Sequence, residues 1–86
     1  MLDDLTARAL APLEGLTEAA RARHAATLLA WLEHQSHVPA VAEVLHVHPQ
    51  TVRYRLAQLR ELFGPALESP GARFELLLAL RGRVGA

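Results

Sequence analysis

The chain contains no cysteine and no lysine, it has only one Trp, one Tyr and two Phe, and its formal net charge is zero. Without cysteine, neither a disulfide framework nor a thiolate metal site can form, and nothing indicates an oxidising compartment, so we expect the cytoplasm. No apolar run approaches the roughly 20 residues that a transmembrane helix needs. The first residues, MLDDLTARAL, are acidic where a secretory signal needs positive charge. We therefore expect neither export nor a membrane partner.

Ala and Leu are abundant, whereas β-branched residues are scarce and hydrophobic residues make up 51% of the chain. This composition favours helices that pack through aliphatic contacts. A chain of 86 residues buries only about 60–65% of its unfolded surface, so a large enclosed active site is not expected. We predict one all-α domain over residues 1–86, a compact bundle of about five helices.

Prolines, glycines and one Ser-His break divide the chain into five helical segments. The predicted helices cover residues 3–10, 17–35, 39–45, 49–63 and 72–84. Acidic residues open the first segment, where they suit the positive end of a helix. Thr17 is a good N-cap for the second, and Pro39 suits the first turn of the third.

The third and fourth segments carry the pattern of a helix-turn-helix. The apolar residues of the fourth are spaced by four, three and four, which predicts one buried stripe. They are Val52, Leu56, Leu59 and Phe63. In the third segment we expect Val41, Val44 and Leu45 to point inward. The turn is predicted at about residues 46–48 and the recognition helix at about 49–63. His46 stands where many such turns place Gly for a positive φ, so we expect a slightly different or modestly strained turn.

The neutral total charge conceals a local excess of basic residues. Residues 44–60 contain three Arg and two His and no carboxylate. A helix held by its buried stripe can project side chains of this kind into a major groove about 12 Å wide. The candidate DNA-binding residues are His48, Gln50, Thr51, Arg53, Tyr54, Arg55 and Gln58.

Several of these residues have a second interpretation. A charged face on an amphipathic helix is often only a solvated surface. His48 suits either a helix cap or a phosphate contact, and Thr51 is also a possible cap. The ring of Tyr54 is an alternative packing element against a neighbouring helix. If Arg53 contacts guanine, its replacement by Ala should reduce specific affinity, and if Arg55 contacts phosphate, its replacement should weaken binding to all sequences.

Metal binding and catalysis are not expected. His46 and His48, with His34 and His37 nearby, suggest a zinc site, but no Cys or third carboxylate accompanies them, and the predicted turn accounts for the pair. The chain has no glycine-rich phosphate loop, no nucleophile with a spaced base and no paired acids in an apolar setting. We predict no metal, no cofactor and no enzymatic activity.

The last segment has apolar residues around most of its circumference. They are Phe74, Leu76, Leu77, Leu78 and Leu80. One interpretation is full burial inside the domain. The other is two packing surfaces, one on the helix-turn-helix and one against a second subunit or a further region of a longer protein. Trp31 is a second candidate for such a contact, although core packing suits it better.

Residues 45–56, LHVHPQTVRYRL, and residues 62–81, LFGPALESPGARFELLLALR, resemble the C-terminal helix-turn-helix domain of PucR-type (purine catabolism and sugar-diacid) bacterial transcription regulators. The resemblance extends over about residues 10–81. Gln50 stands where the family usually has Asn, and Gln offers the same donor and acceptor groups.

The resemblance implies a DNA-binding output module, usually attached to an N-terminal sensory region that responds to a metabolite. These residues do not include such a region, so we expect an excised domain or a very short relative. The predicted function is sequence-specific binding of double-stranded DNA by a homodimer, with the sensory domain of the full-length regulator as a further partner. The alternative is a helical protein-interaction or dimerisation module without direct DNA contact.

Overall fold

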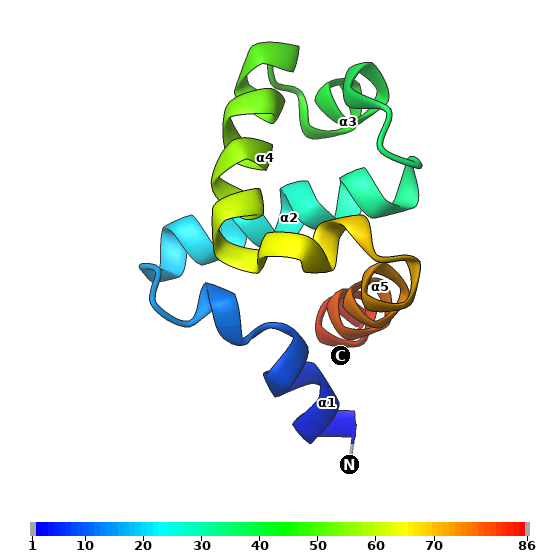
Figure 1. Cartoon of the computed structure of the whole chain (residues 1–86). Helices are drawn as coiled ribbons and strands as arrows, with labels where there is room; N and C mark the ends of the chain where they lie inside the picture. The colour runs from blue at the N-terminus through cyan, green and yellow to red at the C-terminus, as the bar shows by residue number, and fades with distance from the viewer. Residues whose placement is uncertain (1, 86) are drawn as a thin grey trace.

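The computed structural model describes the backbone of residues 2–85 and the side chains of residues 6–82. Within the described residues the chain forms five α-helices and two short 3-10 helices, and no strand (Figure 1). The elements are α1 (Leu2–Ala9), η1 (Ala11–Leu13), α2 (Glu18–Glu33), α3 (Val38–Leu45), α4 (Pro49–Phe63), η2 (Gly64–Glu68) and α5 (Pro70–Gly85). The predicted all-α bundle is confirmed. Residues 1 and 86 of the predicted domain lie outside the described residues, as do the acidic side chains of Asp3 and Asp4.

Helix α2 begins and ends for local reasons. The Thr17 Oγ1 accepts a hydrogen bond from the Ala20 backbone N–H at 3.2 Å, so Thr17 is the N-cap, as predicted. The predicted end at Gln35 is wrong by two residues. Gln35 and Ser36 have φ angles of 52° and 67°, and two left-handed residues in succession cannot continue a right-handed helix.

The α2–α3 connection is fixed by an arginine from α5. The Arg73 Nη2 donates a hydrogen bond to the Ser36 Oγ at 2.7 Å. Its guanidinium carbon also lies 4.5 Å from the centroid of the Trp31 ring, a cation–π distance. Trp31 is buried in the core, in agreement with the core-packing interpretation.

Among the described residues, every helix except α1 contributes buried side chains to the core. Fully buried side chains come from η1, α2, α3, α4, η2 and α5 in turn. They include Leu13, Leu28, Val41, Val52, Leu59, Leu67 and Leu80. Helices α3 and α4 pack on each other and on α2 at one end of the molecule, whereas α1 packs on α5 at the other end (Figure 1). The α3–α4 pair is therefore supported from one side and free on the other.

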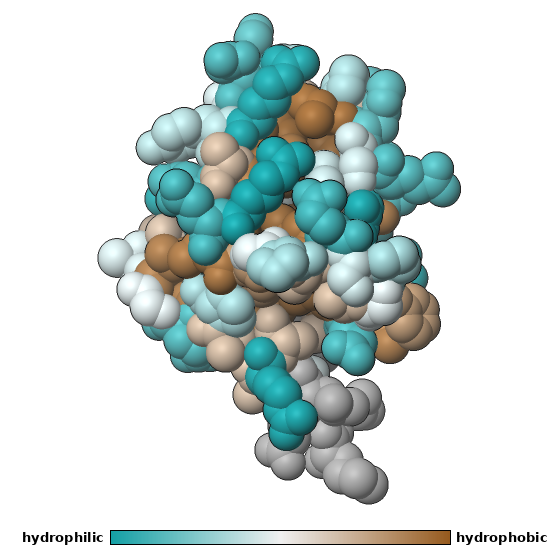
Figure 2. All heavy atoms as spheres, viewed as in Figure 1, coloured by the Kyte–Doolittle hydropathy of each residue, from teal (hydrophilic) through white to brown (hydrophobic). Residues whose placement is uncertain are grey.

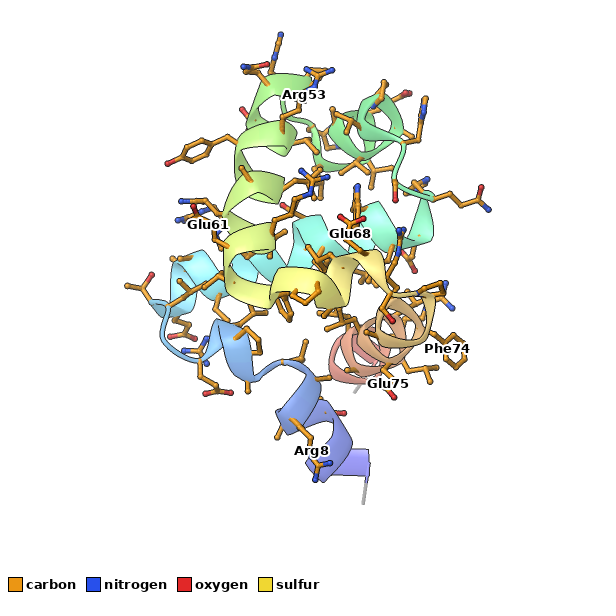
Figure 3. The ribbon with its side chains drawn as sticks, viewed as in Figure 1. Arg8, Arg53, Glu61, Glu68, Phe74 and Glu75 are labelled. Carbon is orange, nitrogen blue, oxygen red and sulfur yellow. The ribbon has the colours of Figure 1, made fainter. Side chains whose placement is uncertain are left out.

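Helix α5 has one buried and one exposed apolar surface. Leu76, Ala79 and Leu80 are buried in the core, but Phe74 and Leu78 are 60% and 54% exposed. Figure 3 shows Phe74 projecting away from the bundle. Full burial of this helix is therefore the wrong interpretation. Within the described residues its buried surface packs on α1, α2 and η2, not on α3 or α4, so the predicted packing on the helix-turn-helix pair is also wrong. Its start at Pro70 precedes the predicted Ala72 by two residues.

Candidate nucleic-acid interface

The turn between α3 and α4 is built on a left-handed residue. His46 has φ 57° and ψ 43°, so it adopts the positive φ that many such turns give to Gly. The Val47 N–H donates to the Ala42 carbonyl at 3.0 Å and the His46 N–H to the Glu43 carbonyl at 3.3 Å. This pair of bonds is the Schellman arrangement, which satisfies the last carbonyls of a helix and reverses the chain sharply. It sets the angle at which α4 leaves α3.

One predicted inward residue of α3 lies on the surface. Val44 is 50% exposed, whereas Val41 and Ala42 are buried and Leu45 is half-buried. At about 100° per residue, Val41, Ala42 and Leu45 share one face of the helix, and Val44 turns well to its side. The inward prediction for Val44 is therefore wrong, because an eight-residue helix needs only one face to pack on α2 and α4.

His48 caps the start of α4. Its Nδ1 accepts a hydrogen bond from the Gln50 backbone N–H at 3.0 Å, and Pro49 occupies the first helical turn. The capping interpretation of His48 is confirmed, and that of Thr51 is wrong because Thr51 already lies inside the helix. Since Nδ1 accepts, the proton of the neutral ring is on Nε2. The exposed His48 side chain therefore presents an N–H donor beside the first turn of α4.

The predicted buried stripe of α4 is present. Val52, Leu56, Leu59 and Phe63 are all buried. They hold one side of α4 against α2 and α3, and this fixes which residues face outward. At about 100° per residue, the remaining side chains fall into three strips.

The central strip lies opposite the buried stripe. It contains Gln50, Tyr54, Ala57 and Glu61, all exposed. Tyr54 is 66% exposed, so its ring does not pack into a neighbouring helix. Its hydroxyl accepts a hydrogen bond from the Gln58 Nε2 at 3.5 Å. Glu61 places a carboxylate two turns beyond Arg53, as Figure 3 shows, so the part of this strip without negative charge is its N-terminal half.

The two arginines next to Tyr54 lie on opposite flanks of α4. Arg53 is exposed, like Arg60 on the same flank, and its Nη1 donates to the Gln50 Oε1 at 3.5 Å. Arg55 is half-buried on the other flank with Thr51 and Gln58, and its Nη1 donates to the Thr27 Oγ1 of α2 at 3.4 Å. The structure thus separates the predicted site residues instead of gathering all of them on one outward face.

The flank that carries Arg55 borders a hollow of about 440 Å³ between α2 and α4. Its polar lining residues are Arg23, His24, Thr51, Tyr54, Arg55 and Gln58. His24 is only 7% exposed. Burial, followed by the positive charges of Arg23 and Arg55, lowers its pKa below the ordinary value of 6.5, against the hydrogen bond with Gln58 that raises it. Sequence reasoning missed Arg23 and His24, although the basic run RARH at residues 21–24 was a visible signal.

The basic residues of α4 form no ion pair with any other described side chain. Among the side chains of residues 6–82 the structure contains one ion pair, between Arg81 and Glu33 at 3.1 Å, on α5 and α2. Figure 2 shows mainly polar side chains over the end of the molecule formed by α3 and α4. The arginines of α4 therefore keep their charge available for an external partner.

Two further findings concern the described residues only. No three His, Asp or Glu side chains among them gather in a way that could hold a metal ion. None of the helices found there combines the length and the apolar character that crossing a bilayer requires.

The fold and the α3–α4 geometry define a helix-turn-helix domain. The chain belongs to the PucR C-terminal helix-turn-helix domain family, whose model matches residues 24–82. The resemblance drawn from residues 45–56 and 62–81 is thus confirmed. The family consists of helix-turn-helix domains of transcription regulators, which is not an enzyme class.

One characterised relative is the purine catabolism regulatory protein of Bacillus subtilis (strain 168). The two sequences are 42% identical over 55 residues, which cover 64% of this chain and 10% of that protein. The chain therefore matches about a tenth of the length of this relative. No solved structure matches the chain with significance.

Proposed function

We propose that this chain binds double-stranded DNA in a sequence-specific manner, as the output domain of a transcription regulator, with the first two turns of α4 in the major groove. One observation carries the proposal. The N-terminal half of α4 is held from behind by Val52 and Leu56, while Gln50, Arg53 and Tyr54 project outward with no carboxylate among them. A recognition helix needs this combination of a fixed register and polar, extended side chains.

The three strips of α4 suit different contacts. Gln50 and Tyr54 in the central strip face the base edges, and the amide of Gln50 suits the donor and acceptor pair of adenine. Arg53, hydrogen-bonded to Gln50 at 3.5 Å, reaches the neighbouring base and suits guanine. His48 and Arg55 lie to the sides, where the phosphates border the groove. Gln58, which donates a hydrogen bond to the Tyr54 hydroxyl, and Thr51 lie on the same flank as Arg55.

We also propose that the chain binds DNA as a homodimer. Two copies of α4 enter successive major grooves about 34 Å apart, which requires a pseudo-palindromic site. In a full-length regulator, the proposed sensory domain would bring two copies together and set the response to an effector. A DNA partner in turn assigns the chain to the cytoplasm of a bacterial cell.

The test is fluorescence anisotropy with a duplex selected from random DNA. Arg53→Ala should lose about 1–3 kcal/mol of specific affinity and relax the preference at one base pair, because one bidentate contact is lost. Arg8→Ala is the matched control, since Figure 3 shows Arg8 on α1 at the end opposite Arg53. Equal affinity of the Arg53 variant and the wild type would overturn the placement of α4. Two symmetric half-sites in the selected sequences would support the dimer.

A helical protein-interaction or dimerisation module is the second candidate function. The exposed Phe74 and Leu78 on α5 favour it, because large apolar side chains on a surface often mark a protein contact. Replacement of both Arg53 and Arg55 distinguishes the two functions. A module of this kind keeps its activity when both Arg53 and Arg55 are replaced, whereas DNA binding does not survive that change.

A further inference from the structure

The hollow between α2 and α4 has the chemistry of an anion site. Arg23 reaches it from α2 and Arg55 from α4, while the hydroxyls of Thr51 and Tyr54 add two hydrogen-bond donors. None of its lining residues is a carboxylate. Its volume of about 440 Å³ falls within the range of about 300–1,000 Å³ usual for small-ligand pockets.

Both guanidinium groups lack a negative partner. Among the side chains of residues 6–82 the only ion pair joins Arg81 to Glu33, so neither Arg23 nor Arg55 is neutralised within that part of the chain. The hydrogen bond from the Arg55 Nη1 goes to a neutral hydroxyl, that of Thr27, and at 3.4 Å it is long. Two like charges that face one hollow repel each other, and a bound anion removes this repulsion.

His24 gives an independent indication. It is more than nine-tenths buried beside the hollow, and its Nδ1 has no hydrogen-bond partner. A buried polar atom without a partner is uncommon in a folded protein and calls for a partner that the folded chain does not supply. Burial first, and then the positive charges of the same two arginines, lower the pKa of His24.

The position of the hollow identifies the source of the anion. Three of its four α4 residues lie on the flank that carries Arg55, and the fourth is the exposed Tyr54 of the central strip. A helix in the major groove has a phosphate backbone along each side, so this flank faces one of the two strands. Arginine pairs with phosphate through two parallel N–H donors.

We propose that this hollow binds a phosphate group of the DNA backbone, held between Arg23 of α2 and Arg55 of α4. This inference rests on the proposed DNA binding and extends the interface from the helix-turn-helix to α2. Arg23 becomes a DNA contact on a helix that otherwise only supports the motif. A free phosphate-bearing ligand has the same chemistry, so the experiment needs one arm for each source.

The first arm measures binding of a duplex at several salt concentrations for the 86-residue chain. Arg23→Gln should lower the slope of log affinity against log salt by about one, equally for specific and random duplexes, because one phosphate contact is lost. Arg8→Gln removes the same charge far from α4 and should leave the slope unchanged. Arg53→Ala should instead change the preference for one base pair.

The second arm follows the amide and side-chain NMR signals of Thr51, Arg55 and Gln58 during titration with inorganic phosphate, against chloride at equal ionic strength. A lower salt slope for Arg23→Gln supports the proposal with DNA as the source. An unchanged slope, with phosphate shifts that Arg23→Gln abolishes, rejects DNA and identifies a free phosphate ligand. If Arg23→Gln changes neither the salt slope nor the phosphate shifts, the proposed site is overturned. If the wild type binds no duplex at all, the proposed function fails, and the NMR arm still decides about the hollow.

Discussion

Helices α4 and α5 have the same construction on the inside and opposite chemistry on the outside. Each presents a buried apolar stripe to the core, with Val52 and Leu56 in α4 and with Leu76 and Leu80 in α5. The outer side of α4 is polar and basic around Arg53, whereas that of α5 exposes Phe74 and Leu78. A buried stripe therefore fixes where a helix lies, and the outward residues decide which class of partner it suits.

The two helices also lie at different ends of the molecule. The α3–α4 end is free of neighbouring helices on its outer side, while α5 packs beside α1, where both termini emerge (Figure 1). DNA recognition by α4 and a protein contact by α5 are therefore compatible in one molecule. The outer side of α4 and the exposed apolar surface of α5 can therefore contact different partners without competing.

The largest expected effect comes from charging the inner side of α4. Val52→Asp places an unpaired carboxylate in the core and should cost about 3 kcal/mol or more, so that the domain loosens or unfolds. Ala57→Asp adds the same charge to the outer side of the same helix, where Ala57 is exposed. It should leave the melting temperature nearly unchanged and weaken DNA binding. Thermal melting by circular dichroism and anisotropy titration check the pair.

Equal melting temperatures for Val52→Asp and the wild type would place Val52 on the surface and overturn the register of α4. Intact DNA binding by a folded Ala57→Asp variant would remove the central strip from the interface. The two variants together therefore test the inside and the outside of α4 separately.

The next effect concerns an arginine of α5 that supports the fold. Arg73 donates to the Ser36 Oγ at 2.7 Å and stacks over Trp31, so Arg73→Ala should cost about 1–2 kcal/mol of stability. For a domain of this size the melting temperature should fall by about 4–8 °C per kcal/mol. Arg53→Ala on α4 is the comparison. Arg53→Ala should leave the melting temperature unchanged and reduce DNA affinity, whereas Arg73→Ala should keep the DNA affinity of the folded fraction. The reverse result would assign the DNA contact to Arg73 and the support of the fold to Arg53.

The sequence predicted the features that depend on local pattern. The spacing of Val52, Leu56, Leu59 and Phe63 located the buried side of α4, and the caps Thr17 and His48 follow from residue type. The position of the sharp reversal was also located, but the sequence suggested a different or strained turn there because His46 replaces Gly, whereas His46 adopts the usual left-handed conformation.

The features that were missed depend on how helices cross. The exposure of Val44 follows from which face of α3 meets its neighbours, and the end of α2 depends on Gln35 and Ser36, which are not typical left-handed residues. The hollow joins Arg23 to Arg55, 32 positions along the chain, through the packing of α2 on α4. No periodicity within one helix reports such a contact.

The smallest expected effect is a pH dependence of the melting temperature that comes from His24, beside the hollow between α2 and α4. The lowered pKa of His24 means that the unfolded chain binds a proton more readily than the folded chain. The contribution of neutral His24 to stability is therefore fully present above about pH 6.5, the ordinary pKa of histidine, and is lost as the pH falls through that value toward the lowered pKa. His24→Gln should flatten the melting temperature between about pH 5 and pH 7 relative to the wild type, because the other four histidines are the same in both proteins. Parallel curves for the two proteins would show that His24 is protonated equally in the folded and unfolded chains. A phosphate bound between Arg23 and Arg55 would offset their charge, so addition of phosphate should also reduce the difference between the two curves.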